Sequence, residues 1–236
     1  MNFLELCAKL TLESGAIGQA PVTTVGVLPR RQAQCVGWIK TAYVLIQNHS
    51  AQFNWLRARF EGELEAGQAR YSPTDILLAA APRFAEWVGE APRRPALTLY
   101  RPEIGRKDET WLRQITEDQW SRSYDFGVHD PSRPVHWAAS YDGSLLFGQT
   151  PDAAYRVRGE YLMTPQVLAA DNDVPDMPAR FHDLIWQRAI MLMAASDEAV
   201  QSLQTAQLEF STGMKALVRD CLPTISAQSE RSLDQR

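Results

Sequence analysis

The sequence predicts an α+β fold: a helical bundle core formed by N-terminal and C-terminal helices, with an inserted small antiparallel β subdomain and an extended C-terminal tail. The spacing of apolar residues follows the helical period of about 3.6 near both ends and changes toward about 2 in the middle. Two amphipathic segments at each end can also pair into one bundle. We therefore expect the core at residues 1–51 and 166–222, the β-rich insertion at 52–165 and the tail at 223–236.

The composition is that of a globular protein. Its 236 residues are 45% hydrophobic and 22% charged, enough for one sizeable core. The formal net charge of −4 argues against a protein whose main work is to grip nucleic acid, but it suits a surface past which DNA slides without sticking.

The three cysteines, Cys7, Cys35 and Cys221, lie on apolar helical stripes, so we expect buried thiols in a reducing compartment. The first residues do not resemble a signal peptide and no window is long enough for a membrane span, so we expect no membrane association.

Two helices are predicted at the N-terminal end. The first spans residues 2–14, with Phe3, Leu6 and Leu10 on one face, and ends at a Ser-Gly pair where glycine can close a helix. A polar loop follows. The second helix spans residues 31–50 and turns Ile39 and Ile46 inward.

The insertion is expected to be a small meander. Charged and apolar residues alternate up to Leu64, as in a half-buried strand, and Asp142-Gly143 is a strong hairpin signal. Thr116 to Gln119 has the form of a capping box that starts a short helix through Tyr124. Residues 74–88 are ambiguous because Pro82 interrupts a helix-like pattern. The further strands are predicted at residues 96–100, 110–115, 135–140, 144–147 and 154–163.

Two more helices are predicted at the C-terminal end. The first should begin near Met177, with Pro178 in its first turn, and run to about Ala195 as a central helix buried on more than one side. The second, residues 197–221, carries an apolar residue at every third or fourth position, and the short connection between the two predicts an antiparallel hairpin. The residues of this stripe are Ala199, Leu203, Ala206, Phe210, Met214, Leu217 and Cys221.

Chemistry-bearing patterns are sparse. A pair of histidine and carboxylate is conceivable where His129, Asp130 and His136 lie near Asp125 and Asp142, but turn and strand roles explain these residues better. His182-Asp183 lacks a second ligand at the spacing of a helical zinc site, and no phosphate-binding loop or nucleophile elbow occurs. We therefore expect no enzyme activity and no catalytic, cofactor-binding or metal-binding residues.

Arginines and aromatic residues are interleaved in the insertion. This mixture can stack on single-stranded nucleic acid, and it is also typical of a sheet surface that faces solvent or another protein. The sequence leaves both interpretations open. The residues concerned are Arg57, Arg59, Arg93, Arg94, Arg101, Arg106, Lys107, Trp55, Trp87, Tyr100 and Trp111.

Three segments share a pattern with one known family. Residues 3–18 (FLELCAKLTLESGAIG) look like its first helix and glycine exit, and residues 36–56 like its second helix, which leads to a tryptophan. Residues 151–189 match its strand ending in Gly-Glu-Tyr, its D-x-D-x-P-x-x-P turn and its following helix. Together these segments resemble the head-to-tail adaptor (head-completion, or connector) proteins of tailed bacteriophages.

The resemblance implies a structural virion protein in the neck between head and tail, made in the host cytoplasm during assembly. It implies a dodecameric ring under the portal protein, a tail or nozzle protein below, and double-stranded DNA that crosses the channel without sequence-specific binding. The polar tail, which we expect to be disordered on its own, then becomes the portal-binding segment. The residues assigned to it are Pro223, Thr224, Ile225, Ser226, Leu233 and Arg236.

The sequence leaves three alternative functions open. One alternative is a DNA-binding or packaging accessory protein, which would bind DNA strongly and in a salt-sensitive way. Another is a different component of the connector, such as a stopper or tail terminator. An enzyme built on the insertion would instead depend on His136 or Asp142.

Overall fold

The computed structural model describes residues 1–13, 22–26, 30–50, 53–77, 83–90, 96–197 and 200–222. The chain divides into two compact units. We call residues 1–56 with 165–236 the helical unit and residues 57–164 the sheet unit. Among the described residues, no helix combines the length and the apolarity that crossing a bilayer requires. The expected tail at 223–236 lies outside the described residues.

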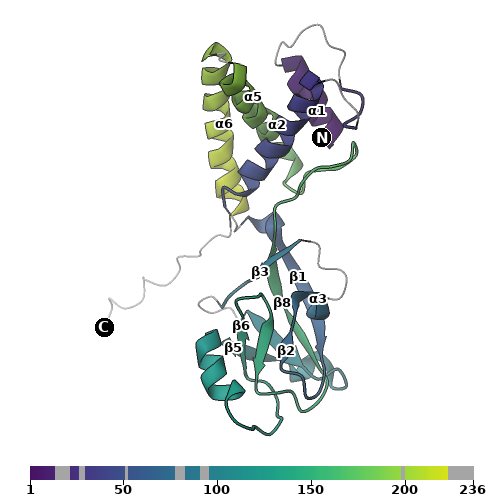
Figure 1. The fold of residues 1–236 in the computed structure, drawn as a ribbon, viewed down its shortest axis with the longest axis vertical. Coiled ribbons are helices and arrows are strands. Elements are labelled where there is room, and N and C mark those ends of the chain that lie inside the picture. Colours follow the sequence, from purple (N-terminus) through teal and green to yellow (C-terminus); the bar gives the residue numbers. More distant parts are fainter. Residues whose placement is uncertain are drawn as a thin grey trace, which may run out of the picture. The chain divides into compact units, whose positions relative to one another are not determined.

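The helical unit contains α1 (Phe3–Glu13), α2 (Arg30–Gln47), α5 (Asp183–Asp197) and α6 (Val200–Cys221). Helix α5 packs against each of the other three, and Figure 1 shows α6 beside it. This confirms the prediction of a central helix, because Ile185 and Ala189 of α5 are fully buried. The 3₁₀ turn Asn54–Leu56 ends the first part of this unit. Its core also includes Phe3, Leu6, Ile39, Tyr43, Ile46 and Leu217.

The predicted start of the central helix is wrong by several residues. Pro178 precedes a 3₁₀ turn, Ala179–Phe181, and α5 begins only at Asp183. The acidic segment before α5 forms a turn of its own, because the carboxylate of Asp173 accepts hydrogen bonds from the backbone N–H groups of Ala169 and Ala170 at 2.6 and 2.8 Å.

The sheet unit contains eight strands: β1 (Arg57–Leu64), β2 (Arg70–Tyr71), β3 (Phe84–Trp87), β4 (Leu97–Tyr100), β5 (Thr110–Gln114), β6 (His136–Ala139), β7 (Leu145–Gly148) and β8 (Tyr155–Met163). They form one curled sheet of order β1-β8-β4-β5-β6-β7-β2, with β3 also paired to β8. Figure 1 shows β1, β3 and β8 beside one another. All neighbours are antiparallel except β5 and β6, which are parallel. Its core includes Trp137, Phe147, Tyr155 and Val157. Short helical segments are α3 (Pro73–Ile76), the 3₁₀ turn Gly105–Asp108, α4 (Glu117–Trp120) and the π-helical turn Ser121–Asp125.

The predicted fold class, a helical bundle core with a small antiparallel insertion, is wrong. The described residues form a mixed α/β protein, with six α-helices and an eight-stranded sheet that has a hydrophobic core of its own. The sheet is larger than a local meander because β8 pairs with three strands, β1, β3 and β4. The spacing of apolar residues indicates which residues of a strand face inward, but it does not indicate which distant strand pairs with it.

Several local predictions are confirmed. Thr116 caps α4: the backbone N–H of Gln119 donates to its Oγ1 at 3.2 Å, and its own N–H donates to Gln119 Oε1 at 3.1 Å. Strands β6 and β7 form the predicted hairpin, in which Gly143 adopts a φ of 83° that favours glycine. The ambiguous stretch 74–88 contains the end of α3 and all of β3, on either side of residues outside the described set.

Candidate interaction surfaces

The residues assigned to portal binding lie outside the described residues, so their role stays a prediction. They are Pro223, Thr224, Ile225, Ser226, Leu233 and Arg236.

The conceivable pair of histidine and carboxylate is not assembled. His136 Nδ1 lies 2.6 Å from the Tyr124 hydroxyl, and His129 Nε2 lies 2.9 Å from the carbonyl oxygen of Phe126. Asp142 is held in the β6–β7 turn by the backbone N–H of Ser144 and, at 2.7 Å, by Arg70. These hydrogen bonds hold the pKa of Asp142 well below its usual range, the Ser144 N–H having the largest effect. A carboxylate so stabilised is a poor general base.

His182 and Asp183 serve the helical unit. His182 is buried, with Nε2 2.9 Å from the carbonyl oxygen of Met177. Burial opposes ionisation of Asp183, but hydrogen bonds from Lys9 at 2.6 Å and Trp186 at 2.8 Å outweigh it and lower the pKa of this carboxyl group. Among the residues that the structure describes, no group of three or more histidines, cysteines and carboxylates could hold a metal ion.

The predicted mixture of arginine and aromatic residues is largely engaged within the sheet unit. Strands β1 and β8 place opposite charges directly across from each other on the face that points away from the core. Arg59 faces Glu160 at 3.4 Å, Glu61 faces Arg158 at 3.4 Å, and Glu63 faces Arg156 at 3.1 Å. We call these six residues the charge ladder.

Polar bonds continue the ladder across β4 and β5. The hydroxyl of Tyr100 donates to Glu61 at 2.6 Å and is the largest cause of the lowered pKa of that carboxyl group. Glu109 accepts hydrogen bonds from Thr98 at 2.7 Å and Arg106 at 3.0 Å, which lower its pKa in turn. These carboxylates are therefore fixed as partners of neighbouring side chains.

The remaining members of the mixture differ in their accessibility. Arg57 and Arg101 form ion pairs with Glu160 and Asp152, while Arg93 and Arg94 lie outside the described residues. Trp55 stacks on Phe53, and Trp87 is buried and donates to the carbonyl oxygen of Gly143. Trp111, in contrast, is 70% exposed. The face thus offers a paired, nearly neutral surface with one exposed tryptophan, which suits a protein contact better than a nucleic-acid track.

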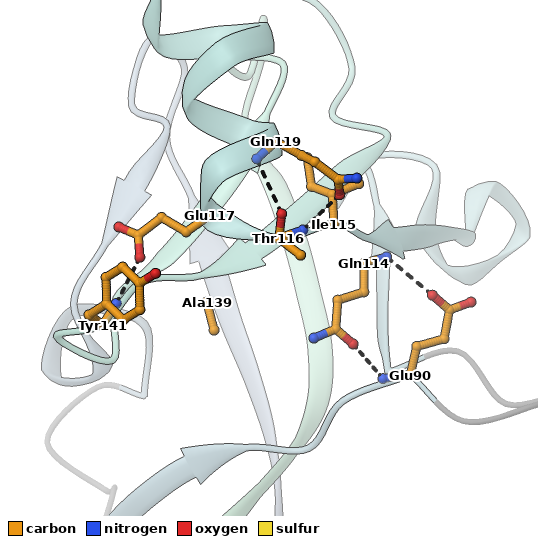
Figure 2. A pocket seen from close by; sticks show the side chains of 8 residues that line it. All are labelled: Glu90, Gln114, Ile115, Thr116, Glu117, Gln119, Ala139 and Tyr141. Atoms are coloured by element: carbon orange, nitrogen blue, oxygen red, sulfur yellow. Dashed lines mark hydrogen bonds between the residues drawn. The ribbon is translucent and has the colours of Figure 1, made fainter.

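A shallow hollow of about 500 Å³ lies beside β5 and α4 (Figure 2). Its polar groups already bond to one another. Gln114 and Glu90 exchange two hydrogen bonds, and Glu117 accepts from the backbone N–H of Tyr141 and the hydroxyl of Ser140. Because these groups are satisfied internally, the hollow lacks the convergent free groups that a small-molecule site needs.

An exposed apolar loop, Phe126-Gly127-Val128, is not among the residues predicted from the sequence; we call it the apolar tip. Phe126 is 84% and Val128 100% exposed. The loop is anchored before the tip by Tyr124 against His136, and after it by the Ser132 N–H, which donates to the Thr150 carbonyl at 2.9 Å. The signal was present as a Phe-Gly-Val triplet within an otherwise polar stretch.

A second feature that was missed is a groove on the helical unit, of about 260 Å³. We call it the helical groove. Its floor is apolar, and the guanidinium of Arg188 lies 5.7 Å from the centre of the Phe210 ring. It is lined by Leu45, Ile46, His49, Arg188, Phe210 and Met214.

Comparison with known families adds one finding. A family model described as SU10 adaptor protein matches residues 1–234, which include both the helical unit and the sheet unit. No curated protein matches the chain.

Proposed function

The chain belongs to the SU10 adaptor protein family, a family of phage head-to-tail adaptors, and we propose that it forms a ring that joins the portal to the tail. The family match over residues 1–234 carries this proposal. Membership makes the protein a phage adaptor with a structural role, a component of the head-to-tail junction of the virion. The ring, its contacts and its channel are the proposed part.

The described surfaces support a role in protein contacts. The charges of the sheet face are satisfied by neighbours, whereas the apolar tip and Trp111 are largely exposed. Exposed aromatic and aliphatic side chains of this kind mark surfaces where proteins bind one another.

We propose that the ring is dodecameric and that its channel passes double-stranded DNA without sequence-specific binding. A net charge of −4 supports this role, because an acidic protein attracts a polyanion less than a basic one does. Strong DNA binding by the purified chain, weakened steeply by salt, would instead favour an accessory protein of DNA packaging.

The segment 223–236 is proposed to dock on the portal, with Ile225 and Leu233 as its apolar anchors. Deletion of this segment should leave the described fold intact and abolish capture of the portal protein in a pull-down. Circular dichroism of the truncated chain provides the folding control. Undiminished capture of portal by a folded, truncated protein would refute the docking role.

The decisive experiment is the mass of the purified chain, alone and mixed with the portal protein of the same phage, by native mass spectrometry. We expect a ring of the chain on the portal. A tail or nozzle protein should then bind that complex and not the portal alone. A chain that remains a monomer in both samples would overturn the proposed function.

A further inference from the structure

We propose that the apolar tip of one copy inserts into the helical groove of a neighbouring copy. This inference deepens the proposed function, since it rests on the ring and names one contact that holds neighbours together. The tip lies in the sheet unit and the groove in the helical unit, so each copy presents both halves of the contact.

The tip is built to be presented. A π-helical turn, Ser121–Asp125, leads into it, and π-helical turns occur frequently at functional sites. The Tyr124 ring occupies the space that a Cβ at Gly148 would need, so this turn packs tightly against β7. Gly127, at a φ of 92°, then lets the chain reverse between Phe126 and Val128. Both ends are thus fixed while the two apolar side chains face solvent.

The groove is the apolar counterpart. Met214 is buried at its base, Phe210 is half-buried, and Leu45 of α2 is 40% exposed at its rim. An apolar side chain that enters from another molecule would contact all three, and removal of its surface from water would stabilise the complex.

Charge decides which apolar segment fits. Asp125 and Asp130 flank the tip, are exposed and form no ion pair with a lysine or arginine of the described residues. Arg188 at the groove pairs with no carboxylate in the described part of the chain and is held against the Phe210 ring. Each surface also has a neighbouring charge that opposes the contact. Arg122 lies in the π-helical turn before the tip, and Glu209, next to Phe210 in the sequence, accepts a hydrogen bond from Gln187 at 3.3 Å. The two free carboxylates of the tip nevertheless match the free guanidinium of the groove.

A contact between two different surfaces of identical chains is heterologous. Repeated from copy to copy, such a contact closes a ring when the rotation between neighbours permits it. The tip and the groove therefore supply the kind of interface that a ring needs, which a contact between two identical patches does not.

Cross-linking between separate variants tests the contact directly. Val128→Cys and Leu45→Cys proteins are purified, mixed in the presence of portal and treated with a short bis-maleimide. The native Cys7, Cys35 and Cys221 are buried, so they should not react in the folded chain. We expect covalent dimers that join one copy of each variant. Leu12→Cys, at a leucine of α1 that is 72% exposed, replaces Leu45→Cys as the matched control and should give few dimers.

Charge reversal provides the second test. Arg188→Glu alone, or Asp125→Arg with Asp130→Arg, should weaken assembly about tenfold or more, because like charges would then meet at the contact. A chain that carries Arg188→Glu, Asp125→Arg and Asp130→Arg together should assemble again, because the charges that meet at the contact are then opposite once more. Asp118→Arg, an exposed change on α4, serves as the control and should leave assembly unchanged.

The outcomes separate this inference from the proposed function. A ring by native mass, with no excess of dimers over the Leu12→Cys control, overturns the contact and leaves the ring in place. Monomers both alone and with portal overturn both. A variant that carries both Leu45→Cys and Leu233→Cys tests the remaining alternative. A cross-link within one chain of this variant, together with no dimers in the mixed sample, would assign the groove to the chain's own segment 223–236 and would also overturn the contact.

Discussion

The helical unit and the sheet unit differ in how their stabilising contacts are distributed. In the helical unit, α5 packs on three helices from both ends of the sequence, and its contacts are mainly apolar. The sheet unit also has an apolar core, but its opposite face carries charges matched strand by strand, as Glu61 and Arg158 show. Buried apolar contacts therefore stabilise both units, while the paired charges determine what the sheet surface offers to a partner.

Replacing a core residue of α5 should have the largest effect. Ile185 is fully buried, so Ile185→Asp places a charge where no partner is available and should lower the free energy of unfolding by about 4 kcal/mol or more. Urea titration followed by circular dichroism measures the change. Leu12→Asp, on an exposed position of α1, is the control and should change stability little. Equal stability of the two variants would contradict the position of the core.

Two glycine-to-alanine changes should act with opposite signs in the two units. A Cβ at Gly62 of β1 would lie 2.5 Å from the backbone oxygen of Ile76, so Gly62→Ala must displace α3 and should destabilise the protein by about 1–3 kcal/mol. A Cβ at Gly37 of α2 would meet nothing within 4 Å. Gly37→Ala should therefore stabilise the protein by about 0.5–1 kcal/mol through helix propensity. Thermal melts of both variants measure the difference.

Acid should weaken the sheet unit more than the helical unit. A carboxyl group whose pKa is lower in the folded state stabilises the fold above its unfolded pKa of about 4, and this contribution is lost as the pH falls through the folded pKa. The described residues with lowered pKa values are Glu61, Asp108, Glu109, Asp142 and Asp152 in the sheet unit, and Asp173, Asp183 and Asp220 in the helical unit. Hydrogen exchange at neutral pH and below about pH 4 should show protection lost first in β1, β4 and β5. Earlier loss in α2 and α5 would contradict this order.

The smallest effect is expected on the charge ladder. Arg59 is 85% exposed on its side chain and lies 3.4 Å from Glu160, so Arg59→Ala should leave the free energy of unfolding unchanged within about 0.5 kcal/mol. Arg158 is less exposed and contacts both Glu61 and Glu109. Arg158→Ala is the matched comparison and should lower the free energy of unfolding more than Arg59→Ala does in the same urea titration. Equal decreases in the free energy of unfolding would contradict this expectation, because the exposed end of the charge ladder would then stabilise the protein as much as its centre does.

Local chemistry was readable from the sequence because neighbouring residues determine it. The capping box of Thr116 and Gln119 and the turn at Gly143 depend on a few adjacent residues, and both are present in the structure. The apolar stripe of α6 is confirmed from Phe210 onward, where Met214, Leu217 and Cys221 are buried. The side chains of its earlier members lie outside the described residues.

What could not be predicted depends on segments far apart in the sequence. The parallel pairing of β5 with β6 joins strands on either side of the π-helical turn and the apolar tip, and no local period reports it. The opposition of Arg158 and Glu61 requires the register of β1 on β8. The helical groove likewise combines residues of α2, α5 and α6. Composition did suggest a protein contact, but only the fold shows that Arg57, Arg59, Arg101 and Arg106 form ion pairs and that Phe126 and Val128 are exposed.

The pairing of β1 with β8 has a consequence for synthesis on the ribosome. Strand β1 leaves the ribosome early, but its partner β8 (Tyr155–Met163) is synthesised about a hundred residues later. Helices α1 and α2 are made before β1, and α5, on which they pack, is made after β8. Once Arg57 lies opposite Leu162, the intervening chain becomes a closed loop whose two ends are held together. Most of the chain entropy that must be lost to bring α2 and α5 into contact has then already been lost in forming the sheet. We therefore expect the sheet unit to fold first during translation and the helical unit to complete itself afterwards.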